Sequence, residues 1–149
     1  GAVDGVTIYK ENLSAAGVNL DVAREPADGY FSNVWLKKPF VASYWGARPT
    51  ADIMFSSAYA SSAKWNETHW KNEAFDKLLE AARVELDESK RAEMYHDMQA
   101  MVRDEGGAVI PLFADNVFAA NEKVGHPDVM SGAWELDGGR SIERWWLAE

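Results

Sequence analysis

The chain has 149 residues, of which 47% are hydrophobic, and its 15 basic and 24 acidic side chains give a formal charge of −9. Such an acidic chain repels a phosphate backbone, so the sequence argues against nucleic acid as a partner. It has no apolar run of membrane-spanning length, and the absence of cysteine excludes disulfides, thiolate metal sites and a cysteine nucleophile. Because the first residues resemble no export signal, we expect any such signal to lie upstream in a longer parent protein.

The first third of the chain predicts helices that alternate with strands. Asp4 can cap a helix that Gly17 ends, and residues 18–23 then alternate apolar and polar side chains as a half-buried strand does. Residues 26–39 predict a second helix between two prolines, and PFVASYW, residues 39–45, predicts a second buried strand. A helix between two strands indicates a right-handed crossover and parallel neighbours, so we predict an α/β fold with a mixed open sheet flanked by helices.

Three more helices and one more strand are predicted further on. Thr50 begins the first of these helices, residues 73–84 form the second, and Asp87 caps a longer third helix that stops at Gly106-Gly107. AVIPLFA, residues 108–114, predicts a third strand, in which Pro111 is confined to an edge or to a strand end. Residues 121–140 are rich in glycine and predict irregular structure.

The candidate binding residues follow the second predicted strand. Ligands of open α/β sheets bind beyond the carboxyl ends of the strands, which places Tyr44, Trp45 and Arg48 near a cleft. Trp45 offers a broad apolar face with one N–H donor, Gly46 lets a ligand approach the backbone, and Arg48 could hold a carboxylate through two parallel bonds. Alternatively, one of the two aromatic residues belongs to the core, and Arg48 is a solvated turn cation.

A second group of candidates lies in the Ser/Ala-rich loop before the helix at residues 73–84. Trp65 and Asn66 stand there among small and polar residues, and loops of this kind often carry sites. We predict that Tyr44, Trp45, Arg48 and Trp65 line one concavity. The full set of predicted substrate-binding residues is Tyr44, Trp45, Gly46, Arg48, Trp65 and Asn66.

Signals for enzymatic chemistry are weak. Glu67, His69 and Glu73 fall close together, but they match no metal-binding pattern such as HExxH. We therefore predict no metal, no cofactor and no catalytic residue. A small hydrolase that depends on His69 stays as an alternative. The seven tryptophans leave a second alternative, a carbohydrate-binding module, because exposed indole faces stack on sugars.

A family resemblance rests on the run from Trp65 to Phe113. It combines an aromatic Asn-containing loop, a helix of pattern N-x-x-F-D-x-L-L-x-x-A, a helix of pattern D-x-x-x-R-x-x-x-Y-x-x-x-Q, and an acidic residue before an I-P-L strand. This order resembles the C-terminal block of the periplasmic solute-binding proteins of the peptide/nickel ABC-transporter family. The matching residues are Asn72, Phe75, Asp76, Leu78, Leu79, Ala82, Asp87, Arg91, Tyr95, Gln99, Glu105, Ile110, Pro111 and Leu112.

The resemblance implies a fragment of a two-lobed, non-enzymatic receptor. Residues 1–112 would be the C-terminal portion of the second lobe, and residues 113–149 a return segment that would complete the first. The parent would capture a peptide or another small solute in the periplasm, or outside the cell on a membrane anchor, and deliver it to an ABC permease. Peptide-binding members are similar in carrying W-x-x-D at Trp45, but here Arg48 takes the place of the acid, which favours an anionic solute. Without its first lobe, the isolated chain should self-associate through the tail from Gly132 to Glu149.

Overall fold

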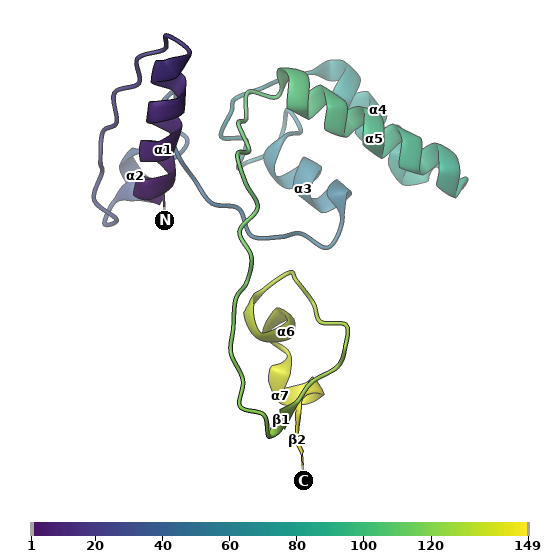
Figure 1. The fold of residues 1–149 in the computed structure, drawn as a ribbon. Helices are drawn as coiled ribbons and strands as arrows, with labels where there is room; N and C mark the ends of the chain where they lie inside the picture. Colours follow the sequence, from purple (N-terminus) through teal and green to yellow (C-terminus); the bar gives the residue numbers. More distant parts are fainter. Residues whose placement is uncertain (1, 149) are drawn as a thin grey trace. The chain divides into compact units, whose positions relative to one another are not determined.

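The computed structural model describes residues 2–148, which divide after Tyr44 into two compact units. The first unit holds α1 (Ala2–Ala15) and the single turn α2 (Tyr30–Asn33) (Figure 1). α1 ends at Ala15, and the predicted stop, Gly17, follows it with a left-handed φ of 81°. The amide of Val18 donates to the carbonyl of Leu13 and that of Gly17 to Ser14, so a glycine-based turn satisfies the last carbonyls of the helix.

The predicted helix over residues 26–39 is only partly present. Gly29 with φ of 83° precedes α2, and Leu36 with φ of 59° follows it. Left-handed residues on both sides cannot continue a right-handed helix, so the helix is limited to a single turn.

The second unit holds α3 (Ala51–Ala58), α4 (Glu73–Val84) and α5 (Glu88–Glu105), followed by β1 (Val124–Gly125), α6 (Glu135–Gly139), α7 (Ser141–Arg144) and β2 (Trp146–Leu147). The sheet has two strands, and the antiparallel register pairs Val124 with Leu147 and Gly125 with Trp146. No helix within residues 2–148 is both long enough and apolar enough to cross a membrane.

The predicted strands at residues 18–23, 39–45 and 108–114 are not strands in the structure. A strand needs a neighbour for its N–H and C=O groups. Within the described chain, turn and loop hydrogen bonds between backbone groups are absent from residues 19–26 and 107–120, which are therefore not paired as strands. The mixed open sheet is therefore not formed, and the chain is rich in helix with one small sheet. Helices that alternate with extended segments are still compatible with a fragment of an α/β protein.

The three helices α3, α4 and α5 form what we call the helix cluster, and their predicted bounds are confirmed. Side-chain caps explain where they begin: Thr50 accepts from the amide of Ile53, Asn72 from Ala74 and Phe75, and Asp87 from Ser89 and Lys90. α4 and α5 lie side by side (Figure 1). The cluster buries an apolar core of Phe55, Ala58, Tyr59, Ala60, Phe75, Leu79, Ala82, Met98 and Val102.

A polar network joins the three helices of the cluster. Arg83 of α4 donates to both carboxylate oxygens of Asp52 in α3, from Nε at 2.7 Å and from Nη2 at 3.0 Å. The hydroxyl of Tyr95 in α5 donates to the same carboxylate at 3.0 Å. These hydrogen bonds, chiefly those from Arg83, lower the pKa of Asp52 in spite of the opposing effect of burial.

The lowered pKa of Asp52 predicts that the helix cluster loses stability in acid. A carboxyl group with a depressed folded pKa contributes its full stabilisation above the unfolded value of 3.8 and loses it as the pH falls through the folded value. Asp52→Asn should therefore lose stability at pH 7 and should lose less than the wild type between pH 7 and pH 3. Urea unfolding at both pH values measures this difference. The exposed Asp97→Asn serves as control and should keep the wild-type loss in acid.

The C-terminal segment is organised around a buried carboxylate. Asp137 is 2% exposed, accepts from the amide of Ser131 at 2.6 Å, and pairs with Nη1 of Arg144 at 2.7 Å. Arg144 also donates from Nη2 to the carbonyl of Val129 at 3.0 Å. Leu136, Asp137, Gly138 and Gly139 all have left-handed φ values, from 49° to 76°. These residues make up most of α6, which is therefore a left-handed turn and not a regular helix, and the ion pair from Asp137 to Arg144 joins this turn to α7.

Candidate functional site

The structure brings together three of the predicted site residues at the start of the second unit. The rings of Trp45 and Trp65 lie with centroids 6.2 Å apart and planes inclined at 58°. The guanidinium carbon of Arg48 stands 5.5 Å from the centroid of the Trp45 ring. Glu67 completes the group, and we call these four residues the Trp45 surface.

Two interactions hold the side chain of Trp45 in place. Its ring packs on the hydrophobic core of the helix cluster, and its indole Nε1 donates to Oε1 of Glu67 at 2.8 Å. The single N–H donor of the indole is thus already in use, so the part of Trp45 that a ligand can meet is the face of its ring. Trp45 thus packs on the core, as the alternative interpretation expects of one of the two aromatic residues, and its contact with a ligand remains a prediction.

Arg48 is held close to its own turn. Its Nη1 donates to the carbonyl of Gly46 at 2.9 Å and to that of Ala47 at 3.4 Å, and the guanidinium lies near the Trp45 ring. Arg48 forms no ion pair among the described residues. The backbone carbonyls therefore hold the guanidinium in place without an ion-pair partner, and its remaining N–H groups can bind an oxyanion.

The other predicted site residues occupy different environments. Gly46 contributes the carbonyl that receives Arg48. Asn66 is buried at 7% exposure, and its amide nitrogen donates to the carbonyl of Trp70 at 2.6 Å, so it organises the loop beneath Trp65. Tyr44 ends the first unit and is 74% exposed. The binding roles of Gly46, Asn66 and Tyr44 remain predictions.

The concavity expected at the Trp45 surface remains a prediction. Two hollows lie elsewhere, one along α1 near Lys10 and Val22, the other in the C-terminal segment near Phe118 and Asp137. The side chain of Trp65 is 48% exposed. A solute on this half-exposed ring would still meet water, and a second wall would be needed to exclude water from it.

The residues considered for enzymatic chemistry do not assemble into a metal site. Within residues 2–148, no group of three or more histidine, aspartate or glutamate side chains could hold a metal ion. Glu67 is engaged with Trp45, and His69 has a left-handed φ of 56° in the loop before α4. The role of Glu67 could not be predicted from the sequence, since only the fold brings it from the loop to the indole 22 residues earlier.

One known protein shares part of this sequence. The chain is 29% identical over 72 residues to the dipeptide-binding protein DppE of Bacillus subtilis (strain 168), a match that covers 48% of this chain and 13% of that protein. The chain thus spans only a small part of the length of that relative. No protein-family model and no solved structure matches the chain. This partial match agrees with the family resemblance seen in the sequence.

Proposed function

We propose that this chain is part of a solute-binding receptor that captures a small molecule or peptide for ABC-type import. The similarity to a dipeptide-binding protein supports the class. The single structural observation that carries the proposal is the Trp45 surface, where two aromatic rings and an unneutralised arginine face one side of the helix cluster. A second lobe that closed over this wall would enclose the solute, and contacts to both walls would stabilise the closed state.

The chemistry of the surface favours a solute that carries a carboxylate. Arg48 can donate two parallel hydrogen bonds to such a group, while the exposed ring of Trp65 can cover an apolar part of the solute. The carboxyl end of a short peptide fits this description, and so does a small organic acid. Glu67 belongs to the same surface and is held by Trp45, and its negative charge would orient the solute with its negative end towards Arg48.

Reversing the charge of Arg48 tests the proposed contact. In the longest natural protein that contains this chain, Arg48→Asp should weaken binding of a carboxylate solute by about 1.5 to 3 kcal/mol, because a charged hydrogen bond is lost. Isothermal titration calorimetry with a short peptide and with its C-terminal amide measures the effect. The wild type should bind the amide more weakly than the acid. The Arg48→Asp variant should bind the amide and the acid with equal affinity.

A matched control separates the local contact from the overall charge. Arg24→Asp makes the same charge change on an exposed residue of the first unit and should leave the affinity unchanged. If Arg48→Asp and Arg24→Asp bind the acid with equal, wild-type affinity, Arg48 does not hold the solute.

At the Trp45 surface, the carbohydrate-binding alternative is favoured by Trp65, and exposed indoles of the C-terminal segment, Trp134 and Trp146, add to it. The ring of Trp65 is 48% exposed and could stack on a sugar, whereas Trp45 is partly buried and has Arg48 near its ring. A glycan array distinguishes the two functions. Binding that is lost in Trp65→Ala but retained in Arg48→Asp would favour the carbohydrate module over the import receptor.

A further inference from the structure

The Trp45 surface carries two opposite charges on one indole ring. Glu67 is half-buried and accepts the hydrogen bond from Nε1 of Trp45 at 2.8 Å. Arg48 lies over the same ring, with its guanidinium carbon 5.5 Å from the ring centroid, and forms no ion pair within residues 2–148. The indole therefore holds a cation and an anion that are not paired with each other.

The loop that carries Glu67 is anchored to the core of the helix cluster. The side chain of the preceding residue, Asn66, donates to the carbonyl of Trp70 at 2.6 Å and accepts from the hydroxyl of Thr68 at 3.1 Å. The ring of Trp70 in turn packs on Phe75, with centroids 5.0 Å apart. Because Asn66 is buried, a displacement of Glu67 would break these contacts. The loop holds the backbone of Glu67, and the indole holds its carboxylate.

The negative charge of Glu67 acts beyond its own hydrogen bond. Burial raises the pKa of Tyr59, and the charge of Glu67 raises it further, because both disfavour the phenolate. Tyr59 is 7% exposed and belongs to the core of the helix cluster. A half-buried charge is screened less by salt than an exposed one, so the field of Glu67 should also reach a solute on the neighbouring ring.

A solute bound at Arg48 lies within range of this field. Since Arg48 and Glu67 lie against one ring, a solute on that ring is within about 10 Å of both, the Debye length at about 0.1 M salt. A carboxylate beside Arg48 gains more attraction than it meets repulsion. A second negative group that extends towards Glu67 meets repulsion alone. At the effective dielectric constant of a protein surface, such a charge changes a dissociation constant by roughly threefold to tenfold.

We propose that Glu67 is a specificity-determining residue, which makes the Trp45 surface select solutes with a single carboxylate and disfavour those with a second negative group beside it. The inference rests on the proposed function and adds the charge class of the solute to it. Arg48 supplies affinity for the first carboxylate, and Glu67 supplies the penalty for the second, so specificity comes from a repulsive group as well as from an attractive one.

Two dipeptides of similar shape test the selection. Ala-Asn has a neutral last side chain, whereas Ala-Asp adds one negative charge to the residue that bears the terminal carboxylate. Isothermal titration calorimetry at low salt, with the longest natural protein that contains this chain, should show tighter binding of Ala-Asn. Glu67→Gln removes the charge but keeps an oxygen that accepts from Trp45. In this variant the ratio of the two dissociation constants should fall roughly threefold to tenfold.

Two further variants separate the local charge from other effects. Glu93→Gln makes the same charge change on an exposed residue of α5 and should leave the ratio unchanged. Glu67→Asp retains the charge on a shorter side chain and should keep the preference for Ala-Asn. If Glu67 acted only by positioning Trp45, the order would be the opposite, since Gln preserves the reach to the indole and Asp shortens it.

Two results would overturn the inference: a ratio that Glu67→Gln leaves unchanged, and a ratio that Glu67→Gln and Glu93→Gln lower equally. If Arg48→Asp weakens the binding of both dipeptides in these cases, the proposed contact stands and only the role of Glu67 is wrong. A wild type that binds neither dipeptide counts against both. The helical circular dichroism should be the same in all variants. If Glu67→Gln loses that signal, Glu67→Ser, which also removes the charge, decides the outcome.

Discussion

Phe75→Ala should destabilise the helix cluster by about 3 to 5 kcal/mol, because it removes a fully buried ring and leaves a cavity. Phe75 is 0% exposed, and its ring meets those of Phe55 at 5.3 Å and Trp70 at 5.0 Å between centroids. The change therefore removes a side chain from the core and two edge-to-face contacts with it. Urea unfolding followed by the helical circular dichroism measures the loss.

Val84→Ala is the control for that measurement. Val84 ends the same helix and is 77% exposed, so its truncation should change the free energy of unfolding by no more than about 0.5 kcal/mol. Equal unfolding midpoints for the Phe75 and Val84 variants would show that α4 does not pack on the core as the structure describes.

Asp137→Ala should release the C-terminal turn. The change leaves the guanidinium of Arg144 and the amide of Ser131 without their acceptor. Loss of one partner from a fully buried ion pair costs about 3 to 5 kcal/mol. Because the side chain of Arg144 is 32% exposed, water compensates for part of the loss, and we expect about 2 to 3 kcal/mol. Asp137→Asn keeps the shape of the side chain and loses its charge, so it should reduce the stability of the turn by less than Asp137→Ala does.

Hydrogen exchange followed by mass spectrometry measures this effect locally. A loss of about 2 to 3 kcal/mol corresponds to exchange that is roughly thirtyfold to a hundredfold faster at the amides of the turn, including Ser131. Glu143→Ala is the control, since Glu143 pairs with Arg140 in the same segment but both side chains are 62% exposed. Exchange that is the same in both variants would refute the organising role of Asp137.

The sequence predicts local structure in the helix cluster well, because the signals there are local. Thr50, Asn72 and Asp87 are capping residues, and each caps the helix that follows it. The apolar spacing of α4 places Phe75, Leu79 and Ala82 on one face, and these three residues are buried.

The strands were predicted less well because a strand depends on a partner distant in sequence. Residues 18–23 and 108–114 have the composition of strands, but the described chain supplies no segment that pairs with them. The same reasoning applies to the candidate site. The sequence indicated Trp45 and Arg48 by type and position, whereas the bond from Trp45 to Glu67 required the folded loop. The division into residues 1–112 and 113–149 remains a prediction, and the structure divides the chain after Tyr44 instead into two compact units.

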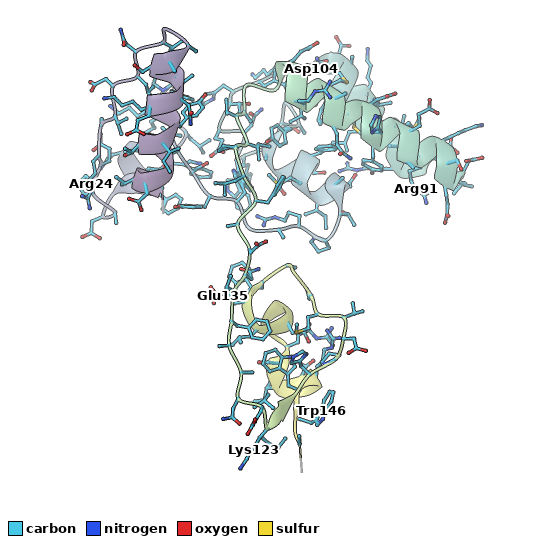
Figure 2. The ribbon with its side chains drawn as sticks, viewed as in Figure 1. Arg24, Arg91, Asp104, Lys123, Glu135 and Trp146 are labelled. Carbon is cyan, nitrogen blue, oxygen red and sulfur yellow. The ribbon has the colours of Figure 1, made fainter. Side chains whose placement is uncertain are left out.

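Figure 2 draws the side chains of the described residues, among which the rings of Trp45 and Trp65 form a close and inclined pair. Two indoles 6.2 Å apart and inclined at 58° couple their electronic transitions, and a skewed pair of this kind produces a two-signed band in the ultraviolet circular dichroism spectrum. The amplitude of that band depends on the distance and angle between the rings. The candidate surface therefore carries a built-in optical signal, which reports on the arrangement of its two rings without any label.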